Sequence, residues 1–118
     1  MNENILKELY KTITERKKTF DIEVEENEKS YTKYLFKEGI NKILKKVGEE
    51  TAETIIAAKD ASIGAGAEDY NTPVIEETAD LLYHLLVMLA ELDIEYSDVE
   101  NELAERTKKT GNLKNNIK

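Results

Sequence analysis

Residues 74–92, VIEETADLLYHLLVMLAEL, decide the fold class of this chain. The stretch begins amphipathic, with acidic residues between apolar ones, and becomes apolar on almost every side after Asp80. A helix that is apolar around its whole girth is buried by several neighbours. We therefore expect a central helix that is covered by other helices of its own chain and also by a second copy of the chain.

Four other segments show apolar residues at helical spacing or signals of a helix end. Gly39 marks the end of a short helix, and Ser97 with Glu100 forms an S-x-x-E capping box at the start of the last helix. Residues 19–29 lack this periodicity and are a predicted loop. In residues 60–73 the preceding helix can continue a little before the chain breaks into a loop, and Pro73 suits the first turn of the next helix. The other expected helices cover residues 5–18, 30–38, 40–58 and 97–107.

These segments predict an all-α protein, a bundle of four or five helices that dimerisation completes. Only the fragment DIEVE, at residues 21–25, alternates apolar and polar residues in the manner of a strand, and it does so weakly. A length of 118 residues suits a single domain. We place this domain at residues 1–107 and expect a polar tail at residues 108–118.

The composition excludes several classes of function. There is no cysteine, which excludes disulfides, thiolate zinc sites and cysteine nucleophiles and favours an intracellular protein. The net charge of -8 argues against nucleic acid as a partner, because its phosphates require clustered Lys and Arg. No apolar run approaches the roughly 20 residues that span a bilayer, and no signal peptide opens the chain. We therefore expect a cytoplasmic protein that binds neither nucleic acid nor membrane.

Two nearly identical acidic motifs lie in the two longest predicted helices. They are EETAE at residues 49–53 and EETAD at residues 76–80. Residues three or four apart share a helix face, so the acidic side chains within each motif converge. One acidic cluster alone is usually a solvated surface. Two clusters on neighbouring helices can supply four or more oxygen ligands to a hard divalent cation, Mg²⁺ or Mn²⁺ rather than zinc. The candidate ligands are Glu50, Glu53, Glu77 and Asp80.

Basic residues and the single histidine lie near these acids in the sequence. Lys45 and Lys46 precede the first acidic motif by one helical turn. There they can contact phosphate oxygens or simply form surface ion pairs. Arg16 can contribute in the same way, although the helix dipole also favours a basic residue at a helix end. His84 follows Asp80 by four residues and can orient this carboxylate by a hydrogen bond, or it is a core residue.

The acidic pattern resembles a known signature. Two E-x-x-E/D pairs separated by 23 residues, at residues 50–53 and 77–80, are similar to the E-x-x-E…E-x-x-D signature of the all-α, MazG-type nucleoside triphosphate pyrophosphohydrolases. Further segments extend the similarity over nearly the whole chain. Within the superfamily, they resemble phosphoribosyl-ATP pyrophosphohydrolase most specifically. They are SYT at residues 30–32, KILKKVGEETAE at 42–53, ADLLYHLLVMLAE at 79–91 and ELAERT at 102–107.

The resemblance implies Mg²⁺-dependent hydrolysis of the α–β phosphoanhydride of phosphoribosyl-ATP to phosphoribosyl-AMP and pyrophosphate, the second step of histidine biosynthesis. It also implies a homodimer. The four acids named above would be the metal ligands, with Glu50 acting in catalysis as well. Glu49 would be an outer ligand or the base that orients water. Lys45, Lys46 and Arg16 would bind the phosphorylated nucleotide, and His84 would support the metal-binding carboxylates.

Two other functions remain open on the sequence. The same acids suit a broader MazG-type enzyme that removes noncanonical NTPs or dNTPs, and they also suit a noncatalytic helical dimerisation or metal-buffering module. Many organisms fuse the phosphoribosyl-ATP activity to a cyclohydrolase whose zinc site needs cysteines. Because this chain is short and has no cysteine, we expect it to be monofunctional.

Overall fold

The computed structural model describes residues 4–22, 30–64 and 69–110. Within these residues every regular element is an α-helix, so the predicted all-α class is confirmed. The DIEVE fragment lies mostly outside the described residues. The helices are α1 (Ile5–Lys18), α2 (Tyr31–Glu38), α3 (Ile40–Ile63), α4 (Asn71–Glu91) and α5 (Tyr96–Thr110).

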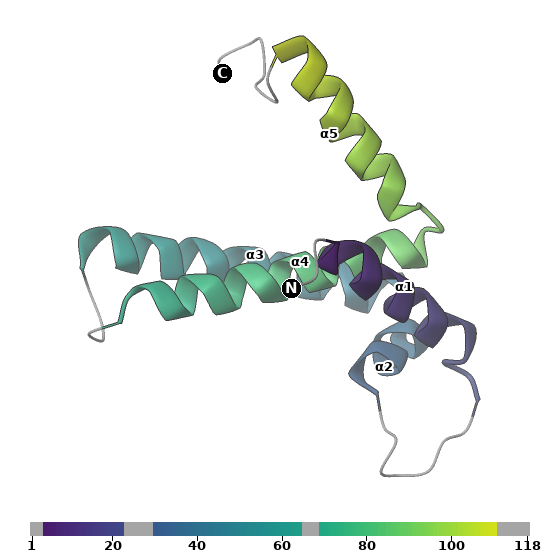
Figure 1. The fold of residues 1–118 in the computed structure, drawn as a ribbon. Helices are drawn as coiled ribbons and strands as arrows, with labels where there is room; N and C mark the ends of the chain where they lie inside the picture. The colour runs from purple at the N-terminus through teal and green to yellow at the C-terminus, as the bar shows by residue number, and fades with distance from the viewer. Residues whose placement is uncertain (1–3, 23–29, 65–68, 111–118) are drawn as a thin grey trace.

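Helices α3 and α4 form a long antiparallel hairpin, and this pair packs more extensively than any other pair of helices described (Figure 1). Helices α1 and α2 lie at the end of the hairpin where α3 begins and α4 ends. Helix α5 leaves the end of α4 and projects away from the hairpin. The framework is therefore a bundle at one end and a bare two-helix hairpin at the other.

Local chemistry sets the boundaries of α2. The Ser30 hydroxyl accepts a hydrogen bond from the backbone N–H of Lys33 at 3.2 Å, which satisfies one of the free amides of the first turn. Gly39 ends the helix with φ of +89°, a backbone conformation that L side chains rarely adopt. The predicted end at Gly39 is confirmed, and this one residue turns the chain from α2 into α3.

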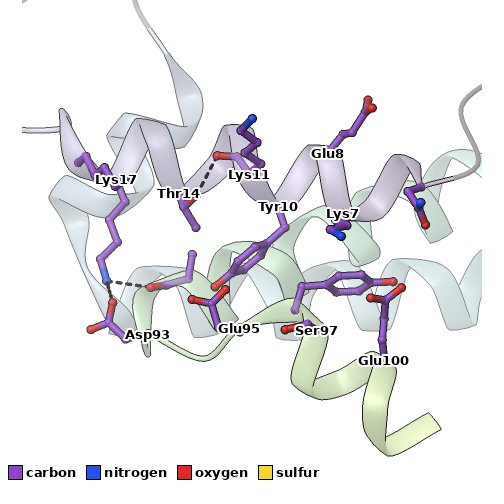
Figure 2. Close-up of a pocket in the computed structure, with 14 residues that line it drawn as sticks. Lys7, Glu8, Tyr10, Lys11, Thr14, Lys17, Asp93, Glu95, Ser97 and Glu100 are labelled. Atoms are coloured by element: carbon purple, nitrogen blue, oxygen red, sulfur yellow. Dashed lines mark hydrogen bonds and ion pairs between the residues drawn. The ribbon is translucent and has the colours of Figure 1, made fainter. Parts of the chain in front are cut away.

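The end of α4 is built by long-range contacts that the sequence did not reveal. Asp93 adopts φ of +57°, and the backbone N–H of Ile94 donates to the carbonyl of Leu89 at 2.9 Å, as in a Schellman cap. Lys17 of α1 donates to the Ala90 carbonyl and to Asp93, each at 2.8 Å (Figure 2). A lysine thus neutralises the negative end of the α4 dipole.

The predicted start of α5 is wrong. The helix begins at Tyr96, so Ser97 lies inside the first turn instead of capping it. The reason is that the chain has already turned at Asp93, and the Tyr96 ring packs against Tyr10 with centroids 6.4 Å apart. Helix α5 also continues to Thr110, three residues into the predicted tail, and residues 111–118 lie outside the described part.

The core lies where α1 and α2 cover the hairpin. Four of its side chains are almost completely inaccessible, one from each of the first four helices: Ile13, Leu35, Ile43 and Val87. The farther half of the hairpin has no such cover from the residues that the structure describes. Ile55 on α3 is 63% exposed and Ile75 on α4 is 65% exposed. The described residues of a single chain therefore leave the first half of α4 open. The buried residues of this helix lie after Asp80, in the part that the sequence predicts to be apolar on almost every side: His84, Leu86, Val87 and Ala90.

None of the helices within the described ranges has the length and apolar character that a membrane crossing requires.

Candidate metal centre

Three of the predicted ligands meet between α3 and α4. Glu50 and Glu53 lie one turn apart on α3, Glu77 faces them from α4, and one carboxylate oxygen from each lies within 4.8 Å of the other two. The Thr54 hydroxyl fixes the helices at this level, because it is 2.7 Å from the Glu50 carbonyl and 3.2 Å from the Glu77 carbonyl. Thr54 was not among the predicted site residues, although it directly follows the first acidic motif in the sequence.

Two oxygens of this cluster are buried without a hydrogen-bond partner among the described residues, Oε2 of Glu50 and Oε2 of Glu77. Glu50 as a whole is only 7% exposed. A buried polar atom without a partner is costly, and a buried carboxylate is more so. The cluster therefore has donor atoms that suit a cation, all of them oxygen, and two of them form no hydrogen bond with any described residue.

Crowding changes the proton affinity of these acids. A hydrogen bond shared with the Glu53 side chain, together with burial and the charges of Glu53, Glu50 and Asp80, raises the pKa of Glu77 from 4.5 to about 7. Burial, assisted by Glu53, also raises the pKa of Glu50. Carboxyl groups packed together thus retain protons close to neutral pH, and a divalent cation would replace those protons.

Asp80, the fourth predicted ligand, lies outside the group of three. It is exposed, one turn after Glu77 on α4, and its charge acts on both Glu50 and Glu77. Glu49 is half-buried, and its Oε2 accepts a hydrogen bond from the Lys46 ammonium at 3.3 Å. The same ammonium is 3.8 Å from Oε1 of Glu50, so Lys46 lies beside the acids on α3.

The other two predicted basic residues are farther from this arrangement. Lys45 on α3 and Arg16 on α1 are both exposed. In the part of the chain that the structure describes, neither forms an ion pair with an acid of the cluster. Of the basic run at the end of α1, Lys17 has a structural partner in α4 instead. The phosphate-binding role predicted for Lys45 and Arg16 stays a prediction.

His84 is buried beside the cluster, with 5% of its surface exposed. Its Nδ1 is 2.7 Å from the carbonyl oxygen of Asp80, and because a carbonyl can only accept, Nδ1 carries the proton and donates. In the neutral imidazole Nε2 then accepts, and it does so from the Tyr31 hydroxyl at 2.9 Å. His84 thus bonds to the backbone of Asp80, whereas the sequence suggested a bond to the carboxylate.

A groove of about 830 Å³ lies apart from the acids, between α1 and the turn that joins α4 to α5 (Figure 2). Its walls carry both charges, with Lys7 and Lys11 on α1 and Asp93, Glu95 and Glu100 across from them. Tyr10 projects into it and donates a hydrogen bond to the Ile94 carbonyl. The groove contains none of the predicted site residues.

The fold and the cluster together define a class: an all-α protein in which two antiparallel helices present three carboxylates that could hold a metal ion. The family is more specific than the class. A model of the phosphoribosyl-ATP pyrophosphohydrolase family matches residues 6–107, and this chain belongs to that family. The resemblance seen in the sequence is thereby confirmed.

Similar proteins agree with this assignment. The chain is 42% identical to a phosphoribosyl-ATP pyrophosphatase of Clostridium novyi (strain NT) over 113 residues, which are 96% of this chain and 90% of that protein. It is 47% identical to the phosphoribosyl-ATP pyrophosphatase of Listeria innocua over 102 residues, 86% of this chain and 84% of the relative. The protein of that name from Clostridium acetobutylicum is 46% identical over 110 residues, with shares of 93% and 87%.

Proposed function

We propose that this chain hydrolyses phosphoribosyl-ATP to phosphoribosyl-AMP and pyrophosphate, the second step of histidine biosynthesis, with the help of a divalent cation. The family and the names of its relatives support the substrate. One observation carries the chemistry: three carboxylates converge between α3 and α4, and two of their oxygens are buried without partners among the described residues.

The cluster suits Mg²⁺, with Mn²⁺ as the alternative. Mg²⁺ prefers oxygen ligands, above all carboxylates. Glu50, Glu53 and Glu77, whose carboxylate oxygens lie within 4.8 Å of one another, would hold the ion. Asp80 is one turn away and would complete the set. No histidine belongs to the cluster, which disfavours zinc.

When bound, the cation would bridge phosphate oxygens and neutralise the charge that develops on the leaving pyrophosphate. The protein's own groups do the rest. Lys46 donates a hydrogen bond to Glu49, and Glu49 orients a water molecule and accepts its proton as the water oxygen attacks phosphorus and the α–β bridge bond breaks. Glu50 shares this catalytic task from the inner side of the cluster. Lys46, and farther out Lys45 and Arg16, bind the phosphates.

Turnover of phosphoribosyl-ATP tests the proposal. The purified protein should release pyrophosphate from phosphoribosyl-ATP, lose this activity in EDTA and regain it when Mg²⁺ is added in excess. A panel of ordinary dNTPs separates the specific function from that of a general nucleotide pyrophosphatase. If dNTPs are cleaved as fast as phosphoribosyl-ATP, the substrate assignment is wrong, and if EDTA has no effect, the cation is not part of the reaction.

The proposal includes a homodimer, and the exposed apolar side chains support it. They lie on α3, α4 and α5, and a second copy of the chain that covers them would remove their apolar surface from water. Light scattering at micromolar concentration should give twice the mass of one chain, and a monomer would contradict this part of the proposal. The residues concerned are Ile55, Ile56, Ile63, Ile75, Leu82, Val99 and Leu103.

A further inference from the structure

The ammonium group of Lys42 on α3 lies over the ring of Tyr34 on α2, 5.9 Å from the ring centroid. This distance is within the range of a cation–π contact. Lys42 is half-buried, and the ion pairs that form among the described residues do not include it. The ring holds the charge in place, and the N–H donors of the ammonium can bind an anion from outside the chain.

Lys42 belongs to a row of charged side chains along α3. Lys46 follows it by four residues and Glu50 follows Lys46 by four more, and residues at this spacing lie along one side of a helix. The Lys46 ammonium is 3.3 Å from Glu49 and 3.8 Å from Glu50, so the row reaches the candidate metal centre. Lys42 lies eight residues before Glu50, about 12 Å along the helix axis. The row therefore begins with a cation that is set well apart from the acids.

Two exposed tyrosine rings of α2 connect Lys42 with the same centre by a second route. The rings of Tyr34 and Tyr31 stack with centroids 6.1 Å apart, and these residues are 43% and 47% exposed. The Tyr31 hydroxyl bonds to Nε2 of His84 at 2.9 Å, and Nδ1 of His84 bonds to the Asp80 carbonyl at 2.7 Å. A continuous series of contacts thus leads from Lys42 to the backbone of Asp80, and exposed aromatic surface forms part of it.

The substrate of the proposed reaction carries phosphate at two separate places. Its triphosphate contains the bond that is cleaved and therefore lies at the acids. Its other phosphate belongs to the phosphoribosyl group, and the base and a ribose separate it from the triphosphate. An ordinary NTP or dNTP lacks this second phosphate. An anion-binding group at a distance from the metal therefore gives selectivity for phosphoribosyl-ATP, and a lysine ammonium suits this task.

We infer that Lys42, held over the ring of Tyr34, binds the phosphate of the phosphoribosyl group. The exposed rings of Tyr34 and Tyr31 lie beside this lysine and suit contact with the base. The inference rests on the proposed function, because it divides that substrate between the acids and Lys42. It adds α2 to a site that the acidic signature confines to α3 and α4, and it identifies a residue that distinguishes phosphoribosyl-ATP from ordinary nucleotides.

The test measures KM and kcat for phosphoribosyl-ATP at saturating Mg²⁺, together with Ki for ATP as a competitive inhibitor. Lys42→Met should raise KM about tenfold, the size expected for a lost hydrogen bond to a charged group, and change kcat by less than about twofold. Ki for ATP should stay within about twofold, because ATP lacks the second phosphate. Lys46→Met, one turn closer to the acids, should weaken the binding of both nucleotides, because it acts on the phosphates that they share.

Two controls separate the charge of Lys42 from the ring that holds it. Lys11→Met on α1 removes one positive charge from an exposed residue in the groove of Figure 2, apart from the acids, and should leave KM and Ki unchanged. Tyr34→Leu removes the ring and should raise KM for phosphoribosyl-ATP about threefold, whereas Tyr34→Phe keeps the ring and should leave KM unchanged.

A native KM for Lys42→Met, or a native KM for Tyr34→Leu, would overturn the inference. So would a rise of KM and of Ki for ATP by the same factor in Lys42→Met, since Lys42 would then attract any nucleotide by its charge. The proposed function is tested separately by the native protein. If it does not turn over phosphoribosyl-ATP, the reaction itself is assigned wrongly, whereas turnover that Lys42→Met leaves unchanged rejects this inference alone.

Discussion

The two ends of the α3–α4 hairpin differ sharply, although the same two helices build both. At one end Ile43 of α3 is completely buried where α2 and α4 pack against α3, and at the other end Ile55, twelve residues along the same helix, is 63% exposed. The acids lie at the boundary between these ends: Glu50 is buried on the core side, and Glu53 is exposed. The covered end thus places the backbone in the core, and the described residues leave the side chains of the open end exposed.

The largest effect that this comparison predicts is on catalysis. Glu77→Gln should lower kcat by about a thousandfold, equivalent to roughly 4 kcal/mol of transition-state stabilisation. The same change removes a crowded charge, so the metal-free variant should melt at a higher temperature than the native protein. Pyrophosphate release and thermal unfolding in EDTA measure the two effects. Glu105→Gln on α5 is the control, and a comparable loss of turnover there would contradict a local role for Glu77.

The second prediction compares stability at the two ends. Ile43→Ala leaves a cavity in the core and should lower the free energy of unfolding by about 2–5 kcal/mol at every protein concentration. Ile55→Ala should have an effect that depends on protein concentration, because its side chain would be covered only by a second copy of the chain. Urea unfolding at two protein concentrations distinguishes the two cases. If Ile55→Ala costs less than about 0.5 kcal/mol at both, this residue lies on a free surface.

How much the sequence could predict depends on how local each signal is. The boundaries of α2 were predictable because the Ser30 cap and the glycine at φ of +89° act within one turn. The start of α5 was not, because it depends on Asp93 and on the packing of Tyr96 against a residue more than eighty positions away. A capping box describes what a helix end prefers, and tertiary contacts decide where the end falls.

The same distinction applies to the site. Convergence of Glu50 with Glu53 follows from helical periodicity, and their meeting with Glu77 follows once the two helices are neighbours. Asp80 lies outside that group because of how α4 is rotated relative to α3. The spacing of residues in the sequence does not predict this rotation. The bond from Tyr31 to His84 joins residues 53 positions apart and could not be anticipated from either segment. The roles of these residues as ligands and catalysts stay predictions.

A third, smaller effect concerns the covered end. Lys17→Met removes the hydrogen bond to the Ala90 carbonyl and the ion pair with Asp93. Because Asp93 is almost fully exposed, the ion pair adds little, and the loss of the cap should lower the free energy of unfolding by about 1 kcal/mol. Thermal unfolding with the neighbouring Lys18→Met as control measures it. Equal melting temperatures for the two variants would mean that Lys17 does not stabilise the end of α4.

The smallest effect is the pH dependence of the metal-free protein. The pKa of Glu77 is raised from 4.5 to about 7, so between these values the folded chain keeps a proton that the unfolded chain has released. The folded state therefore binds more protons, and its stability should fall as pH rises from 4.5 to about 7. Glu50, whose pKa is also raised, acts in the same direction.

Other groups titrate in this range, so the difference between the native protein and Glu77→Gln isolates the contribution of Glu77. In EDTA, the melting temperature of the native protein should drop below that of the variant as the pH rises through this window. With Mg²⁺ in excess the order should reverse, because the ionised cluster then binds the cation and stabilisation by metal grows with pH. A difference that stays constant across the window would mean that Glu77 is not crowded in solution. The acids would then be an exposed patch, and the boundary between the two ends of the hairpin would carry no site.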